Sequence, residues 1–231
     1  MTEKLPVVFV PGLGCTARLF EAQLAALGDR TAMVADHTRH ADIAAIAEDV
    51  LAAAPERFAL VGLSMGGYVA FEILRRAPDR VVRLALLDTT AYPDTEEGRA
   101  RRRTLIAAAE RGKLGSIHAA TFARYVEPGR VADAELEAVV RGMLFATGAP
   151  AFVRQMTAIL NRADYEPLLE RIACPTLVLV GENDAPTPPD HARRMAAAIP
   201  GARLAVLPAT GHLSTLENPD GVNAELTPFL G

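Results

Sequence analysis

The sequence predicts an α/β fold in which a mostly parallel sheet carries helices on both faces. Short apolar runs rich in Val, Leu and Ala alternate with segments of helical periodicity, and Gly, Pro or Asp bounds the runs. Strands that are buried on both faces have such continuous apolar sequences. The 231 residues are 50% hydrophobic and 23% charged, which fits one globular domain with an insertion.

About six strands and five helices around them are expected. The strands are predicted at residues 6–10, 31–35, 58–62, 82–87, 176–181 and 203–207. The helices are predicted at residues 17–27, 42–54, 65–76, 190–199 and 220–230. In the second of these helices Ile43, Ile46 and Val50 recur at helical spacing, so one face of it should pack on the sheet.

Residues 90–168 interrupt this alternation. The stretch contains several segments of helical periodicity, and glycines and prolines such as Gly112, Pro128 and Gly148 separate them. An excursion between two strands of one sheet is a natural cap over the loops that leave it, although extra scaffold helices are the alternative. We therefore expect a core of residues 1–89 and 169–231 with a helical cap at 90–168.

Residues 62–67 have the sequence GLSMGG and lie between a predicted strand and a predicted helix. Gly62 and Gly66 stand two positions before and after Ser64, where a sharp strand-to-helix turn needs small residues. Such a turn lifts the serine hydroxyl above the sheet and points the amides of the helix N-terminus at its target. The spacing predicts that Ser64 is a nucleophile.

A serine hydroxyl needs a base to take its proton and an acid to orient that base. His212 follows the last predicted strand, and Asp184 follows the strand before it. The carboxyl ends of parallel strands meet at one edge of a sheet, so both side chains should lie beside Ser64. Glu182 and Asp88 also follow strands and are alternative acids.

The order Ser64, Asp184, His212, together with the sequences GLSMGG, GEND at 181–184 and GHLSTLENP at 211–219, resembles the α/β-hydrolase superfamily over nearly the whole chain. The resemblance implies that Ser64 is the nucleophile, His212 the general base and then acid, and Asp184 its orienting partner. It also implies a minimal version of the fold, because family members usually carry two more strands before the first one seen here. No metal or organic cofactor is implied.

The same resemblance implies an oxyanion hole formed by two backbone N–H groups. One belongs to Met65, directly after the nucleophile, and the other to Leu13 in the loop after the first strand. Related enzymes often begin this loop with histidine, whereas here Pro11 occupies that position and stiffens the loop without removing the Leu13 N–H.

Apolar side chains of the predicted cap could line a pocket for the substrate, although core packing is expected for most of them. The candidates are Phe122, Tyr125, Met143, Phe145, Phe152 and Met156. A substrate carboxylate could bind Arg39, Arg124 or Arg154, although an arginine of this kind is more often a surface charge.

We expect hydrolysis of a small carboxylic ester or lactone through an acyl-enzyme on Ser64. Hydrolysis of C–C bonds, perhydrolysis and acyl transfer use the same triad and stay open, as does a non-catalytic ligand-binding protein of the same fold.

The charge pattern gives no sign of a nucleic-acid partner. The formal net charge is −4 and the pI about 5.8, and the dense basic run 99–103 is interpreted as a solvated helix face. His37 and His40 have a spacing that metal sites use, but a polar loop is the favoured interpretation. Of the five histidines, His118 and His191 lack triad spacing.

The sequence predicts a cytoplasmic protein that does not enter a membrane. It shows neither a signal-peptide pattern nor an apolar run of about 18 to 20 residues. Cys15 and Cys174 are interpreted as free thiols in a reducing compartment, because the strand order places them at opposite ends of the sheet.

The predicted strand 31–35 becomes an edge of the sheet, since the usual preceding strands are missing. Unpaired backbone groups at an edge must be covered, bulged or paired with a second copy of the chain. We therefore predict a homodimer paired through this strand, measurable by light scattering. Monomer alone at high concentration would contradict it.

Overall fold

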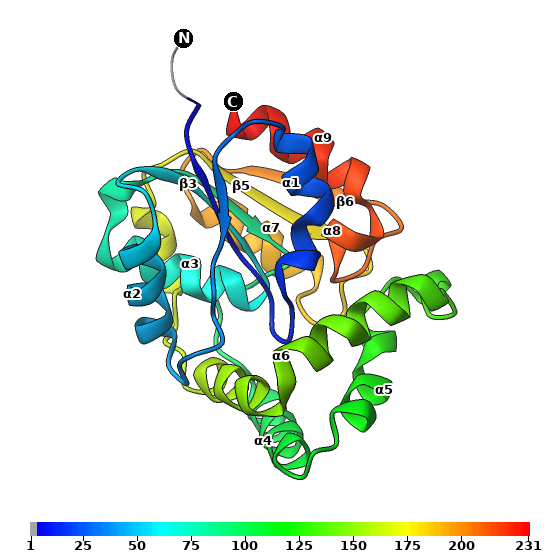
Figure 1. Cartoon of the computed structure of the whole chain (residues 1–231). Helices are drawn as coiled ribbons and strands as arrows, with labels where there is room; N and C mark the ends of the chain where they lie inside the picture. Colours follow the sequence, from blue (N-terminus) through cyan, green and yellow to red (C-terminus); the bar gives the residue numbers. More distant parts are fainter. Residues whose placement is uncertain (1–3) are drawn as a thin grey trace.

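The computed structural model describes residues 4–231. Residues 1–3, the first residues of the predicted core and of the N-terminal segment that was inspected for a signal peptide, lie outside it. A six-stranded sheet with the order β2-β1-β3-β4-β5-β6 runs through the core (Figure 1), and all its neighbouring strands are parallel. The strands are β1 (Val7–Val10), β2 (Ala32–Val34), β3 (Phe58–Leu63), β4 (Val81–Leu87), β5 (Thr176–Gly181) and β6 (Arg203–Leu207). The predicted fold class is confirmed.

Helices cover both faces of the sheet because its strands are apolar on both sides. Along β1, Val8 and Val10 join one hydrophobic cluster, while Val7 and Phe9 join the other. The first cluster contains α2 (Ile43–Ala53), α3 (Met65–Arg76) and α7 (Pro189–Ala198), and the second contains residues of α9 (Pro219–Leu230) with α1 (Glu21–Leu27) packed against it. The core therefore consists of two layers, one on each face.

Most predicted elements end within one or two residues of the observed ones. The exception is the segment 17–27, which begins as the 3-10 turn η1 (Ala17–Phe20) before α1 starts. Thr16 caps this turn by accepting a hydrogen bond from the Arg18 N–H. Short elements not anticipated are η2 (Pro78–Arg80), η3 (Pro128–Arg130), η4 (Glu166–Arg171) and α8 (Ser214–Glu217).

Three long helices, α4 (Glu96–Glu110), α5 (Leu114–Tyr125) and α6 (Ala134–Leu160), lie between β4 and β5, and the segment that contains them is called the insertion. Figure 1 shows them at the end of the sheet opposite the chain termini. Strands β1, β3, β4, β5 and β6 all end toward this side, so the insertion lies over the carboxyl edge of the sheet.

Within residues 4–231, α6 alone has the length and composition of a membrane-spanning helix. Its backbone breaks at Gly148, where φ is 78° and ψ is 159°, and Pro150 follows. Neither half then reaches the ~20 residues that a bilayer requires. In the second half, Ile159 is buried in the first hydrophobic cluster and Met156 in a third one within the insertion.

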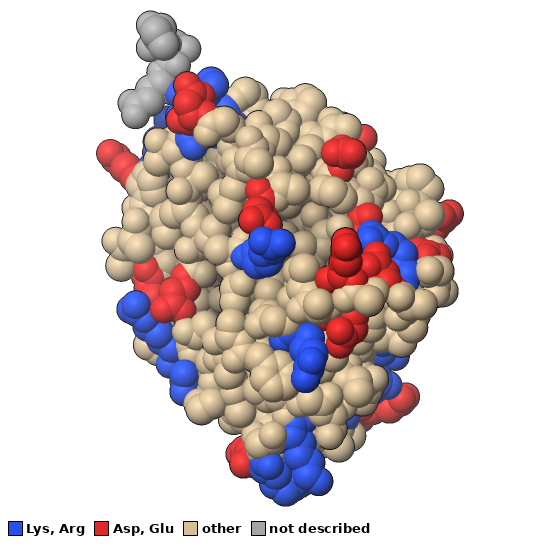
Figure 2. Space-filling model, turned by 45° about the vertical axis from the view of Figure 1, so that its right-hand side comes forward, with Lys and Arg blue, Asp and Glu red and all other residues tan. Residues whose placement is uncertain are grey.

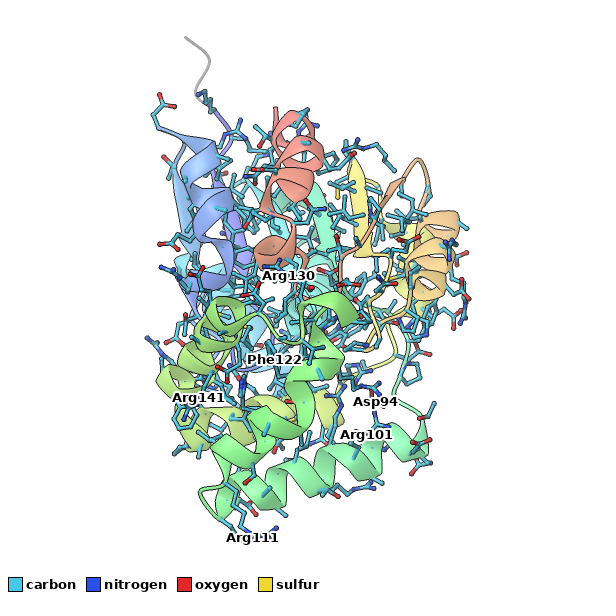
Figure 3. All side chains as sticks on the ribbon, turned by 90° about the vertical axis from the view of Figure 1, so that its right-hand side faces the viewer. Asp94, Arg101, Arg111, Phe122, Arg130 and Arg141 are labelled. Carbon is cyan, nitrogen blue, oxygen red and sulfur yellow. The ribbon has the colours of Figure 1, made fainter. Side chains whose placement is uncertain are left out.

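Strand β2 forms one edge of the sheet, as the sequence predicts. It has three residues, and all of them are only partly buried. Figure 2 shows acidic and basic side chains interspersed over one face of the molecule, with a small basic group at the tip of the insertion. Figure 3 places Arg111 at this tip.

The turn from β3 into α3 carries the predicted nucleophile. Ser64 has φ of 54° and ψ of −113°, a conformation that residues with side chains seldom adopt. A Cβ atom at Gly66 would overlap the carbonyl oxygen of Val10, and one at Gly62 would overlap that of Gly66. Helix α3 therefore approaches β1 and β3 so closely that only glycine fits.

Replacing Gly66 by alanine should displace α3 and destabilise the protein by at least ~1–3 kcal/mol, because the backbone of Val10 and Pro11 leaves the methyl group no space. Gly142→Ala in α6 is the matched control, since a Cβ there meets no atom within 4 Å and alanine favours a helix by up to ~1 kcal/mol. Thermal unfolding followed by circular dichroism measures both. Equal midpoints for the two variants would contradict the close approach.

Candidate active site

Ser64, His212 and Asp184 form one hydrogen-bonded chain at the carboxyl edge of the sheet. The Ser64 Oγ lies 2.9 Å from His212 Nε2, and His212 Nδ1 lies 2.8 Å from Asp184 Oδ2. A carboxylate only accepts, so Nδ1 carries the proton and Nε2 is left to accept from the serine hydroxyl. The structure thus brings together the three residues that the sequence proposed.

Asp184 is held by a residue that the sequence analysis did not identify. The Thr187 N–H donates to Asp184 Oδ1 at 2.8 Å, and the Thr187 hydroxyl donates to Oδ2 at 2.7 Å. Asp184 and His212 are buried, with 2% and 5% of their surface exposed. These bonds hold the Asp184 carboxylate facing the imidazole. The only feature of the sequence that could indicate Thr187 is its position three residues after Asp184.

The two alternative acids occupy other places. Glu182 is exposed, and its carboxylate accepts only a long bond of 3.4 Å from the Ala209 N–H. Asp88 is fully buried and accepts from the Gly181 N–H at 3.0 Å and from the N–H and hydroxyl of Ser214. Asp88 therefore links the loop that carries Asp184 to the loop that carries His212, without touching the imidazole.

Several buried charges set the protonation of the site. Burial is the largest influence on the pKa of His212 and lowers it, but Asp184, through its charge and its hydrogen bond, and then Asp88 and Glu217 raise it above the ordinary value. Burial and the charge of Asp184 raise the pKa of Asp88 to about 8. The imidazole is thereby a stronger base than a free one.

The loop after β1 presents an N–H group to the site. Leu13 and Met65 each have a backbone N–H without an acceptor among residues 4–231. The Gly12 carbonyl accepts from His37 Nε2 at 2.9 Å and from the Cys15 N–H at 3.2 Å. In a trans peptide the C=O and N–H point in opposite directions, so fixing the Gly12 oxygen also fixes the Leu13 N–H.

A second contact holds this loop from the insertion. The Gly14 N–H donates to the side-chain oxygen of Gln155 in α6 at 3.0 Å, and Gln155 is fully buried. The Gly14 amide is thus occupied and is not available as a donor to the site. Gln155 carried no sequence signal, because a glutamine inside an apolar helix does not reveal its partner.

The structure separates the two histidines considered as metal ligands. His37 turns inward to Gly12, and burial lowers its pKa, so it stays neutral. His40 pairs with Asp49 on the surface at 2.9 Å. No group of three potential metal-ligating side chains occurs in the described part of the chain.

A cavity of about 340 Å³ opens above Ser64 and His212. The insertion supplies much of its wall, and the predicted residues Tyr125, Phe152 and Met156 line it. Two other aromatic candidates lie outside this wall. Phe122 packs in the core against His118, and Phe145 is 47% exposed beneath the Arg141 guanidinium.

Met143, the remaining apolar candidate, is buried in the second hydrophobic cluster, which agrees with the core packing expected for most of these side chains. These side chains share similar sequence surroundings, and the insertion has two packing partners, the sheet edge and its own helices. Helical periodicity alone therefore could not sort pocket from core.

The three arginines considered for a substrate carboxylate lie in different places. Arg39 pairs with Asp36 on the surface, and Arg154 donates to the Thr38 carbonyl, whereas Arg124 reaches the cavity wall. Within the basic run 99–103, the interpretation as a solvated face is wrong for Arg102, which turns into the cavity wall with 22% of its side chain exposed.

This geometry agrees with a comparison to known protein families. Residues 7–225 match the alpha/beta hydrolase family. The chain belongs to this family.

Individual relatives of the chain are esterases and lactonases. A pimeloyl-[acyl-carrier protein] methyl ester esterase of Chromobacterium violaceum is 30% identical over 77% of this chain and 71% of its own. A thermophilic esterase of Thermogutta terrifontis, solved with malate bound, superposes with a TM-score of 0.89 at 30% identity over 98% of this chain and 89% of that one.

The enol-lactonase of Burkholderia xenovorans LB400 gives a TM-score of 0.88 at 25% identity, covering 98% of this chain and 91% of that one. The comparisons confirm the predicted family and its class of activity, a hydrolase with esterase and lactonase relatives.

The raised pKa of His212 predicts the pH dependence of the reaction. Only the neutral imidazole accepts a proton, so kcat/KM for a p-nitrophenyl ester should fall on the acid side with a midpoint above ~6.5. Glu217→Gln removes a negative charge that raises this pKa, so the midpoint should move to lower pH. Asp79→Asn, at an exposed residue just before β4 begins, should leave it unchanged. A midpoint that rises in Glu217→Gln would refute this account.

Proposed function

We propose that the protein hydrolyses a small carboxylic ester or lactone through an acyl-enzyme on Ser64. The observation that carries this proposal is the hydrogen-bonded chain of Ser64, His212 and Asp184, which opens into an apolar-walled cavity. Membership of the alpha/beta hydrolase family and the esterase and lactonase relatives support it.

In the first half of the reaction, His212 Nε2 takes the proton as Ser64 Oγ attacks the substrate carbonyl carbon. The carbonyl oxygen becomes negative and receives hydrogen bonds from the Leu13 and Met65 N–H groups. Asp184 stabilises the imidazolium that forms. When the intermediate collapses, His212 returns the proton to the leaving alkoxide, which departs as an alcohol and leaves the acyl group on Ser64.

Water completes the reaction. His212 takes a proton from the water as its oxygen attacks the acyl carbon, and the same two N–H groups hold the second oxyanion. Collapse releases the acid and returns the proton to Ser64. An alcohol, an amine or peroxide in place of water would change only this half of the cycle.

The helical insertion, residues 90–168, serves as a cap in this proposal, because its side chains form much of the cavity wall and Gln155 holds the oxyanion loop. A cytoplasmic location accords with the free thiols of Cys15 and Cys174. Burial raises the pKa of Cys15 to about 12, so this thiol is no rival nucleophile.

Ser64→Ala should lower kcat for p-nitrophenyl butyrate by at least about a thousandfold, because no other group can form the acyl-enzyme. Ser116→Ala, on the exposed surface of α5, should retain the wild-type rate. A fluorophosphonate reagent followed by intact-mass measurement should label wild type and Ser116→Ala but not Ser64→Ala. Equal rates in all three proteins would exclude a serine hydrolase.

A further inference from the structure

The cavity wall contains hydrogen-bond donors that have no acceptor. The Nη1 of Arg102 has only the weak acceptor Sδ of Met156, at 3.8 Å. Among residues 4–231, the hydroxyls of Tyr68 and Tyr125 have no partner, although both rings line the cavity. Burial raises the pKa of Tyr125, so its hydroxyl keeps its proton. Arg102 interacts through its charge with both Tyr68 and Tyr125, so these three side chains lie near one another and offer protons to whatever fills the cavity.

The same wall carries more positive than negative charge. Arg102 donates through Nε and Nη2 to Asp94 at 2.6 and 3.2 Å, and Arg162 donates to the same carboxylate through both Nη atoms at 3.0 Å. Burial alone would raise the pKa of Asp94, but the two guanidinium groups hold it well below the ordinary value. One ionised carboxylate thus pairs with two guanidinium groups. Because guanidinium groups do not lose their charge, this cluster carries one net positive charge.

These residues come from separate elements that meet at the base of the insertion. Figure 3 shows Asp94 close to α4, the helix that carries Arg101 and Arg102. The Arg162 guanidinium lies 4.4 Å from the centre of the Tyr68 ring, so this cation also fixes the phenol. The side chain of Arg162 is only 3% exposed, and its contacts hold it in place. Arg102 has 22% of its side chain exposed, and its Nη1 is still available to a ligand.

Other charged groups around the cavity leave this excess uncompensated. The exposed Arg101 pairs with Glu97 at 3.0 Å, and His118 pairs with Glu137 at 2.7 Å. Burial lowers the pKa of His191, which keeps it neutral near pH 7. Arg124 also borders the cavity, but it is exposed and donates to the Ala185 carbonyl at 3.4 Å, so solvent screens its charge.

We propose that Arg102, Tyr68 and Tyr125 bind a carboxylate of the substrate, so that the preferred substrate is an ester or lactone carrying a second, free carboxylate. This inference rests on the hydrolase function proposed above. A carboxylate accepts several hydrogen bonds, and its single charge equals the surplus left by two arginines on Asp94. A dianionic phosphate would leave excess charge in a largely apolar cavity.

The geometry also limits the length of the substrate. The Tyr125 ring lies 5.7 Å from the His212 imidazole, so the carboxylate subsite adjoins the catalytic chain. The cavity of about 340 Å³ has room for a small molecule. The two ends of the substrate are therefore separated by a short chain, as in the monoesters of small dicarboxylic acids.

Monomethyl glutarate and the neutral dimethyl glutarate test this subsite through initial rates of hydrolysis. Wild type should have the higher kcat/KM for the monoester. Arg102→Met should lower kcat/KM for the monoester by about tenfold to a hundredfold, mainly through KM, because one charged hydrogen-bond donor is lost. The rate for the diester should change by less than about threefold.

Arg103→Met is the matched control, since Arg103 is exposed on the same helix and lies outside the cavity wall. It should leave both substrates unaffected. Tyr68→Phe and Tyr125→Phe remove one hydroxyl each without altering charge, and each should lower kcat/KM for the monoester by about threefold to tenfold. These variants keep the test valid if Arg102→Met fails to fold.

Glutarate binding to Ser64→Ala, measured by calorimetry, separates this inference from the proposed function. Binding should be lost in Ser64→Ala combined with Arg102→Met. Ser64-dependent hydrolysis of both esters without preference for the monoester would overturn the subsite and leave the hydrolase. Arg102-dependent glutarate binding without hydrolysis of either ester would sustain the subsite and overturn the hydrolase. Tighter binding of inorganic phosphate than of glutarate would overturn the carboxylate assignment.

Discussion

The close approach of α3 to β1 and β3 is the constraint on which the rest of the site depends. Glycine at positions 62 and 66 lets the helix begin directly after the strand, and Ser64 then takes a left-handed conformation that costs of order 1–3 kcal/mol. Hydrogen bonds pin this residue on both sides. Its N–H donates to the Leu87 carbonyl, and its carbonyl accepts from the Thr89 hydroxyl. The hydroxyl is held in place before any substrate arrives.

Hydrogen bonds also fix the positions of the base His212 and its partner Asp184. Asp184 and His212 belong to loops after different strands, and Asp88 accepts hydrogen bonds from both loops. With a pKa raised to about 8, Asp88 is largely neutral at pH 7, so it links the loops without placing a second full charge beside Asp184. The donors, the base and the acid are thus fixed by backbone and buried contacts, which is the preorganisation that electrostatic catalysis requires.

The sequence predicted the parts of this protein that follow from strand order. Ser64, Asp184 and His212 each follow their own strand, and parallel topology alone brings strand ends together, so their meeting needed no knowledge of side-chain packing. Thr187, His37 and Gln155 could not be found in this way. Each acts through a backbone or carboxylate group of another segment, and the partner is set by tertiary packing that a single sequence does not show.

The pocket depends on such packing even more. Phe145 and Phe152 have similar neighbours in the sequence, yet the break at Gly148 divides α6 and turns them to different surroundings. Within the run 99–103, adjacent arginines differ because Asp94, two residues before α4 begins, pairs with Arg102 and draws it inward, while Arg101 and Arg103 face solvent. The composition of α4 reveals that the helix is basic, but only the fold shows which of its arginine side chains turn inward.

The inward arginine also bears on how binding energy is used. Burying charge costs free energy, and here two cations share one anion, so the empty cavity retains an electrostatic cost that a bound carboxylate offsets. A neutral substrate enters the same cavity without that gain and with the donors of Arg102 and the tyrosines left unpaired. Discrimination between charged and neutral esters therefore comes from the unbalanced wall, while the hydrogen-bonded chain at Ser64 treats their acyl groups alike.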